Sequence, residues 1–183
     1  MKSFKLMTMA TLLATATMML ASSCKKNKEA RVVFYQTEAD ALRWVDDCGK
    51  ALGEIAKELG ATISDKEIDD ILNTTTLEFY VDGQKLSNTI AVNYFVKNEA
   101  ALNCDVVDFP TFTMNLGKDS QHTCTLKVNL KDEDKIMATG DMTVTIEADK
   151  CNMVRFSYSE LEKTLELNQD YLEELIGAII LSL

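Results

Sequence analysis

The sequence predicts an α+β protein, in which a long N-terminal helix and a C-terminal helix pack on a curved antiparallel sheet of five to seven strands. Two patterns lead to this prediction. Apolar residues recur at helical spacing over residues 42–59 and 171–183. Between these segments, apolar and polar residues alternate along several runs. Strict alternation is typical of an antiparallel sheet with one buried and one solvated face.

The long helix is expected to begin after Thr37 and to end at Gly60. Thr37 is a good N-cap residue, and Asp40 three positions later completes a weak capping box. Glycine is the preferred residue just beyond a helix C-terminus. Cys48 lies on the apolar face, so it could meet a cysteine on a strand. The apolar stripe consists of Leu42, Val45, Cys48, Leu52, Ile55 and Leu59.

Several shorter segments are less regular. Residues 32–35 are apolar, and they form either a first strand or a cover for the core. Ser64 and Glu67 make a second capping box, which predicts a short helix ending near Leu72. Residues 98–107 fit a loop, a short helix or a weak strand.

A β-hairpin is predicted around Asp82-Gly83, a dipeptide typical of type I′ turns. This turn places Phe79 opposite Leu86. It keeps the apolar residues as far as Val96 on one face, so we expect a continuous second strand. That face would include Leu86, Ile90, Val92, Tyr94 and Val96.

Alternating segments at 112–116, 123–131, 136–148 and 154–158 predict further strands. The third is long for a flat sheet. Gly140 lies inside it, which indicates a bend or bulge and hence a curved sheet.

The C-terminal part begins with a third capping box, Ser159 with Glu162. Residues 165–167 fit a helix or a strand, and Asp170 then begins the last helix. Its apolar stripe is wide, so the helix either closes the core or forms an interface with a partner or a second copy. The stripe consists of Tyr171, Leu172, Leu175, Ile176, Ile179, Ile180 and Leu183.

The first 23 residues have the features of an export signal. Lys2 and Lys5 are followed by an uncharged apolar run over residues 6–20 and then by small residues. A membrane-spanning helix needs roughly 20 apolar residues, so this run favours a removed signal over a permanent span.

The segment Leu20-Ala21-Ser22-Ser23-Cys24 resembles the lipobox of bacterial lipoproteins. The resemblance implies that Cys24 receives a diacylglycerol and becomes the first residue of the mature protein. It departs from the family in having Ala21 three residues before the cysteine, where leucine is favoured. Ala21 and Ser23 also suit ordinary signal peptidase, which would leave Cys24 exposed but without lipid.

These features predict a signal peptide over 1–23, a lipidated basic tether over 24–36 and one acidic domain over 37–183. The lysines that follow Cys24 differ from the acidic residues that some surface-exposed lipoproteins carry there. We therefore expect a lipid-anchored protein of the bacterial cell envelope that faces the periplasm, with the membrane as a partner through Cys24.

The predicted domain is strongly acidic, with 13 basic and 28 acidic residues over 37–183 and hence a net charge of −15. Such a surface argues against nucleic acid as a partner. Four cysteines remain after Cys24. An even number in an exported chain predicts disulfides in one of three connectivities, and buried free thiols are the alternative. These cysteines are Cys48, Cys104, Cys124 and Cys151.

Catalytic motifs are absent from the sequence. His122 is the only histidine, and no nucleophile elbow, paired-histidine zinc motif or phosphate loop occurs. His122 and Cys124 would share one strand face, but without C-x-x-C spacing a structural role is favoured over zinc. The acidic runs at 65–70 and 132–134 fit a solvated helix face and a charged turn better than a calcium loop. We expect no enzymatic activity, cofactor or metal.

Two functions fit these observations. The first is a non-enzymatic interaction module for a protein partner, and the second is a carrier of an apolar ligand. A carrier needs a cavity of roughly 300 Å³ or more, whereas an interaction module has a filled core. The lining expected for a carrier is Tyr94, Met114, Met142 and Val144.

Overall fold

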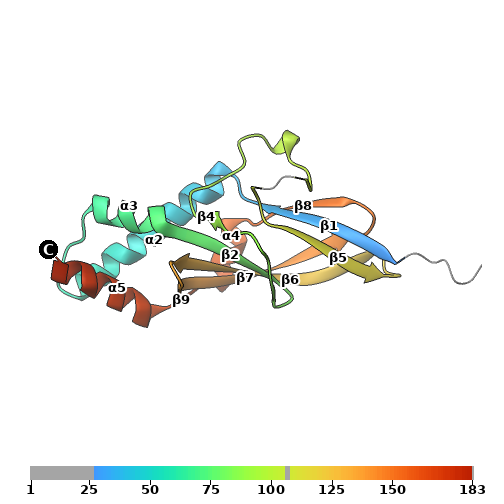
Figure 1. The fold of residues 1–183 in the computed structure, drawn as a ribbon. Helices are drawn as coiled ribbons and strands as arrows, with labels where there is room; N and C mark the ends of the chain where they lie inside the picture. The colour runs from blue at the N-terminus through green and yellow to red at the C-terminus, as the bar shows by residue number, and fades with distance from the viewer. Residues whose placement is uncertain (1–26, 106–107, 183) are drawn as a thin grey trace, which may run out of the picture.

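The computed structural model describes residues 27–105 and 108–182, and it confirms an α+β fold with largely antiparallel strands. Helices gather at one end of the molecule, and the strands extend toward the other (Figure 1). The helices are α2 (Glu38–Glu58), α3 (Asp65–Thr74), α4 (Tyr158–Leu161) and α5 (Gln169–Ser182), with short 3₁₀ turns at Glu99–Ala101 and Glu162–Thr164.

The strands form two sheets rather than the single sheet that the sequence predicts. The smaller sheet has the order β5 (Thr111–Gly117), β1 (Lys28–Tyr35), β8 (Cys151–Arg155). In it, β1 pairs antiparallel with β5 and parallel with β8. The larger sheet has the order β3 (Gln84–Lys85), β2 (Thr75–Val81), β6 (Gln121–Asp132), β7 (Lys135–Glu147), β9 (Glu166–Leu167), and β4 (Ile90–Ala91) also pairs with β2.

Strand β1 corrects the expected tether over 24–36. Residues 28–35 are a strand of the smaller sheet, and Val32, Val33 and Phe34 are fully buried. Val32 and Phe34 face the main core, whereas Val33 belongs to a second apolar cluster with Leu102, Cys104 and Phe109. The folded domain therefore includes β1, which confirms the strand alternative for residues 32–35 and extends that strand back to Lys28. The predicted signal peptide over 1–23 and Cys24 lie outside the described residues.

Helix α2 begins as predicted, with a capping box between Thr37 and Asp40. Helix α3 likewise begins with the predicted box between Ser64 and Glu67. Trp44, Leu52 and Ile55 of α2 are buried in the main core.

The predicted hairpin is confirmed at its turn and is wrong in its second strand. Asp82 and Gly83 have φ values of 47° and 80°, as a type I′ turn requires, and the Leu86 amide donates to the Phe79 carbonyl. The second strand stops after Lys85, and only Ile90–Ala91 rejoins β2. Beyond it, the buried Gln36 side chain donates to the carbonyls of residues 92 and 94 and holds the chain close to the end of β1.

The paired strands β6 and β7 confirm the longest alternating segments of the sequence. Their register shifts between Leu130 and Lys131. Gly140 has a different role from the predicted bend. A Cβ atom at this position would lie 3.2 Å from the carbonyl oxygen of the buried Leu161, so the glycine allows this backbone to approach β7 closely.

Candidate functional site

Helix α5 closes the core and also leaves apolar side chains at the surface. Leu172 and Ile176 are almost fully buried. Leu175 is half-buried, and Leu181 is 90% exposed. One face of α5 therefore packs against the core, as expected for a helix that closes it, and the neighbouring face remains open to solvent.

Two open hollows flank α5 and together form what we call the α5 surface. The first, of about 400 Å³, lies between α5 and the β6–β7 turn. The second, of about 340 Å³, lies between α5 and α3. Both are lined by Asp132 and Leu175. The other lining residues are Glu133, Asp134, Lys135, Tyr171, Glu174 and Ala178 in the first hollow, and Glu67, Asp70, Ile71, Thr74 and Ile179 in the second.

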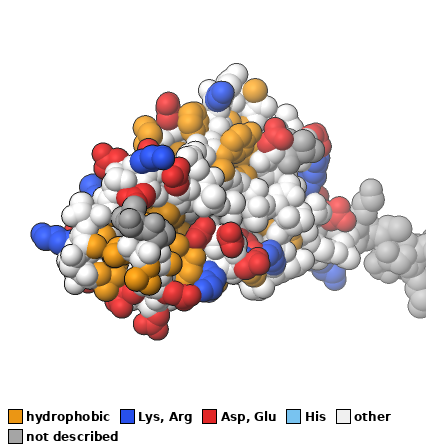
Figure 2. All heavy atoms as spheres, turned by 60° about the vertical axis from the view of Figure 1, so that its left-hand side comes forward, with side chains coloured by type: hydrophobic (Ala, Val, Ile, Leu, Met, Phe, Trp, Pro, Cys, Tyr) orange, Lys and Arg blue, Asp and Glu red, His pale blue; other side chains and the backbone are white. Residues whose placement is uncertain are grey.

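The rim of the α5 surface is acidic. Six carboxylates line the two hollows, against the single lysine Lys135. Lys135 is already engaged, because its Nζ lies 3.0 Å from Glu174 and 4.9 Å from the centre of the Tyr171 ring. Figure 2 shows hydrophobic side chains gathered at this end of the molecule with acidic side chains around them.

The centre of the rim is fixed by hydrogen bonds to Asp132. The Tyr171 hydroxyl donates to one carboxylate oxygen at 2.9 Å, and the Thr74 hydroxyl donates to the other at 3.1 Å. Burial and the hydrogen bond to Asp132 raise the pKa of Tyr171 above its ordinary value. The phenol therefore stays protonated and keeps donating, which joins α5, the end of α3 and the end of β6.

The acidic residues of this rim were predicted only as a solvated helix face and a charged turn. They are distant in sequence, since Glu67 and Asp70 lie on α3 and Asp132–Asp134 lie at the β6–β7 turn. The pairing of β2 with β6, in which Thr75 opposes Asp132, brings the two groups to the same end of the sheet. No local sequence pattern predicts that these acidic residues form one rim.

Another open hollow, of about 540 Å³, lies on the outer face of the larger sheet. Its charged residues are Lys127 and Asp141, which oppose each other on β6 and β7. A balanced pair of charges does not select a partner by its charge, so the α5 surface is the stronger candidate. The remaining lining residues are Tyr80, Gly83, Thr125, Asn129 and Ile136.

Of the four residues expected to line a carrier cavity, three belong to the main core and Tyr94 lies apart from them. Met114, Met142 and Val144 pack with the main core. Tyr94 has left the sheet and stacks on Phe109 of the second cluster, with ring centres 5.1 Å apart. A continuous strand through Tyr94 was the basis for grouping it with the others, and the structure does not form that strand.

The space between α2, β7, β9 and α5 is small, with a volume of about 10 Å³. Apolar side chains line it. This volume is about that of one water molecule, far below the several hundred Å³ of typical ligand pockets. The residues around it are Cys48, Ala51, Leu52, Leu130, Met137, Ala138, Leu167 and Leu172.

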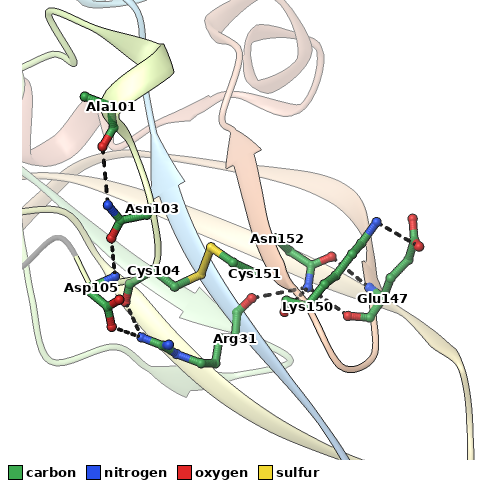
Figure 3. The surroundings of a disulfide bond; sticks show 9 residues. All are labelled: Arg31, Ala101, Asn103, Cys104, Asp105, Glu147, Lys150, Cys151 and Asn152. Carbon is green, nitrogen blue, oxygen red and sulfur yellow. Dashed lines mark hydrogen bonds and ion pairs between the residues drawn. A yellow bond between two sulfur atoms is a disulfide. The ribbon is translucent and has the colours of Figure 1, made fainter.

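One of the expected disulfides is present. Cys104 and Cys151 are bonded, which ties the segment over the second cluster to β8 (Figure 3). Arg31 also connects β1 with the segment around Cys104. Its guanidinium donates to the Cys104 carbonyl at 2.8 Å and pairs with Asp105.

The other two cysteines remain free thiols, so the expected meeting of Cys48 with a strand cysteine does not occur. Burial raises the pKa of the Cys48 thiol to about 12 and that of the Cys124 thiol to about 11. Both thiols are therefore protonated at neutral pH and behave as small apolar side chains.

His122 lies at the surface, where its Nε2 is 3.1 Å from a carboxylate oxygen of Asp82. Asp82 also accepts from the Thr125 amide at 2.9 Å. These bonds lower the pKa of Asp82, with the Thr125 bond making the larger contribution. Within residues 27–105 and 108–182, no three histidine, cysteine or acidic side chains are grouped closely enough to hold a metal ion.

Fold and surface together define a disulfide-bonded α+β protein with an acidic, partly apolar surface on its last helix. Comparisons with family models, with curated proteins and with solved structures give no match. In the described part of the chain, every helix is too short or too polar to span a membrane.

Proposed function

We propose that this chain is a lipid-anchored protein of the bacterial cell envelope, held through Cys24 and facing the periplasm, that serves as a non-enzymatic interaction module. The observation that supports this most is the α5 surface, where half-buried apolar side chains lie between six carboxylates. A surface that is apolar at its centre and charged at its rim has the general anatomy of a protein interface.

The chemistry of the α5 surface selects the class of partner. A segment with an apolar face and flanking lysines or arginines would bury Leu175 and Ala178 and place its cations beside the acidic rim. A second copy would set a second acidic rim against the first. A basic partner therefore fits this surface better than a homodimer through α5.

The filled core supports an interaction module over a carrier of apolar ligands. The space of about 10 Å³ between the helices and the sheet leaves no room for such a ligand without repacking of the core. A carrier would have to open between α2 and α5, where Leu52, Leu172 and Ile176 are almost fully buried.

The anchor follows from the resemblance of residues 20–24 to a lipobox. Each buried acyl CH₂ contributes about 0.8 kcal/mol, so two or more chains hold a protein stably on a membrane. We expect Cys24→Ser to move the full chain from the membrane fraction to the soluble fraction and to abolish labelling by radioactive palmitate. A Cys24→Ser chain that stays with the membrane would contradict lipid anchoring through this residue.

Binding to the α5 surface can be tested with a synthetic amphipathic helix of about 18 residues made of leucine and lysine. The test variant is Asp70→Lys with Asp134→Lys, two exposed rim residues. The matched control is Glu54→Lys with Asp119→Lys, which changes the net charge equally at exposed positions outside the α5 surface.

We expect the rim variant to weaken binding of the full chain at least about tenfold, and the control to weaken it by less than about threefold. Added salt should reduce this difference, because exposed charges are screened. Equal losses in the two variants would show that the peptide responds to net charge alone, and would remove the α5 surface as the binding site.

A further inference from the structure

Strand β5 is an edge strand whose outer backbone groups have no partner among the described residues. It pairs with β1 alone (Figure 1). The Phe34 amide donates to the Pro110 carbonyl, and Val32 opposes Phe112. Because hydrogen bonding alternates along an antiparallel ladder, residues 112 and 114 bond to β1, and Thr111, Thr113 and Asn115 direct their amides and carbonyls outward.

The chain covers the comparable edge of β7 but leaves that of β5 open. Strand β9 pairs with residues 138 and 139 of β7. The Thr164 hydroxyl accepts from the Asp141 amide and donates to its carbonyl. The Asn152 side chain makes the same two bonds with the backbone of Glu147. Only Thr143 and Thr145 lie between these two covers.

Strand β5 also lacks most of the usual protection of an edge over residues 111–115. Edge strands are normally blunted by charged side chains, prolines or bulges. Residues 111–117 contain no charged residue and no proline, and the one register shift against β1 lies at the end of the strand, between Asn115 and Gly117. Phe112 and Met114 are only half-buried at the border of the main core, so an added strand would cover apolar surface as well as satisfy backbone groups.

We propose that β5 pairs with β5 of a second copy of this chain, antiparallel, with Thr113 opposite its own symmetry mate. This register sets outward-facing residues against each other, so Thr111 exchanges hydrogen bonds with Asn115 of the second copy. Three such pairs form about six backbone hydrogen bonds. The same register places Phe112 beside Met114 of the second copy, on the face that borders the core.

The charges at the two ends of β5 select a second copy in this orientation. Asp108 and Lys118 lie five residues to either side of Thr113. Neither makes an ion pair with another described residue. Antiparallel pairing about Thr113 brings Asp108 of each copy to Lys118 of the other, whereas a parallel arrangement would bring like charges together.

Disulfide cross-linking of the full chain in detergent tests this register. Thr113→Cys is expected to form a covalent dimer under mild oxidation. Thr111→Cys alone is not, because the two cysteines would lie roughly 14 Å apart, beyond the reach of a disulfide. A mixture of Thr111→Cys and Asn115→Cys chains should cross-link to each other. Thr143→Cys on β7 is the matched control, and the parent chain reports any dimer formed through its native cysteines.

Equal cross-linking of the Thr113→Cys, Thr111→Cys and Thr143→Cys chains would overturn the proposed pairing. Absence of a cross-linked dimer of Thr113→Cys would also overturn it. A second measurement does not depend on introduced cysteines. Thr113→Lys places like charges opposite each other at the symmetry axis but leaves the bonds between β1 and β5 intact, and Thr143→Lys is its control.

Analytical ultracentrifugation should show that the parent and Thr143→Lys dimerise, whereas Thr113→Lys raises the dimer dissociation constant at least about tenfold. A parent chain that stays monomeric at about 100 µM would refute the second copy as the occupant of this edge. A dimer unaffected by Thr113→Lys would place the interface elsewhere, with the α5 surface as the next candidate.

Discussion

Cys104 and Cys151 join two segments that flank β1, one covering its Val33 side and the other pairing with it as β8. The bond closes a sequence separation of 47 residues. It thereby fixes the irregular segment after β4, which has little regular structure of its own, to the smaller sheet.

Loss of this disulfide should lower the free energy of unfolding by about 2–4 kcal/mol, because a loop of this length restricts the unfolded chain substantially. The test is urea denaturation of Cys104→Ser with Cys151→Ser against the parent. A reducing agent should destabilise the parent and leave the double variant unchanged. If a reducing agent left the free energy of unfolding of the parent unchanged, the Cys104–Cys151 bond would not be stabilising.

The two free thiols should resist modification in the folded protein. Burial is the main cause of the raised pKa values of Cys48 and Cys124, about 12 and about 11, so little thiolate exists at pH 8. A thiol reagent at pH 8 should leave both cysteines unmodified in the native chain and label both in urea. Tryptic mass mapping assigns the labels, and rapid native labelling of either cysteine would contradict the structure.

Asp40 and Arg155 should make stability depend on acid pH. Burial opposes ionisation of Asp40, but hydrogen bonds from Arg155 at 2.7 and 3.0 Å and from Thr37 outweigh it and hold its pKa below 3.8. Stabilisation from a carboxyl with a lowered pKa is complete above the unfolded-state value and disappears as the pH falls through the folded-state value.

We therefore expect Asp40→Asn to lower the free energy of unfolding by about 1–3 kcal/mol at pH 7, and by less as the pH falls below about 4. Asp46→Asn is the control, since its pair with Lys50 is exposed and its loss should leave stability nearly unchanged. If the difference in the free energy of unfolding between the parent and Asp40→Asn stayed constant from pH 7 to pH 2, ionisation of Asp40 would not contribute to stability.

Two glycine-to-alanine substitutions should change the stability of the protein in opposite directions. Gly140→Ala puts a methyl group 3.2 Å from the Leu161 carbonyl and should destabilise by about 1–2 kcal/mol. Gly53→Ala meets nothing within 4 Å inside α2 and should stabilise by about 0.5–1 kcal/mol. Thermal denaturation compares the two, and stabilisation by Gly140→Ala would show that β7 and Leu161 separate readily.

Elements governed by neighbouring residues were predictable from the sequence. The capping box of α2, the type I′ turn at Asp82-Gly83 and the alternating strands β6 and β7 all agree with the structure. Each depends on backbone stereochemistry or on a short apolar period, and both act over a few residues. The continuous strand through Tyr94 failed because Gln36, 58 residues earlier, binds that part of the backbone instead.

The α+β class, the helix and strand periods, the acidic charge and the resemblance of the N-terminus to a lipoprotein signal all follow from the order of the residues. The packing of distant segments was needed to show that residues 28–35 belong to the folded domain, that Cys104 pairs with Cys151, and that acidic residues from α3 and the β6–β7 turn surround α5. The physical reason is separation along the chain. Pairings between distant segments depend on how whole sheets and helices pack, and no local period encodes that choice.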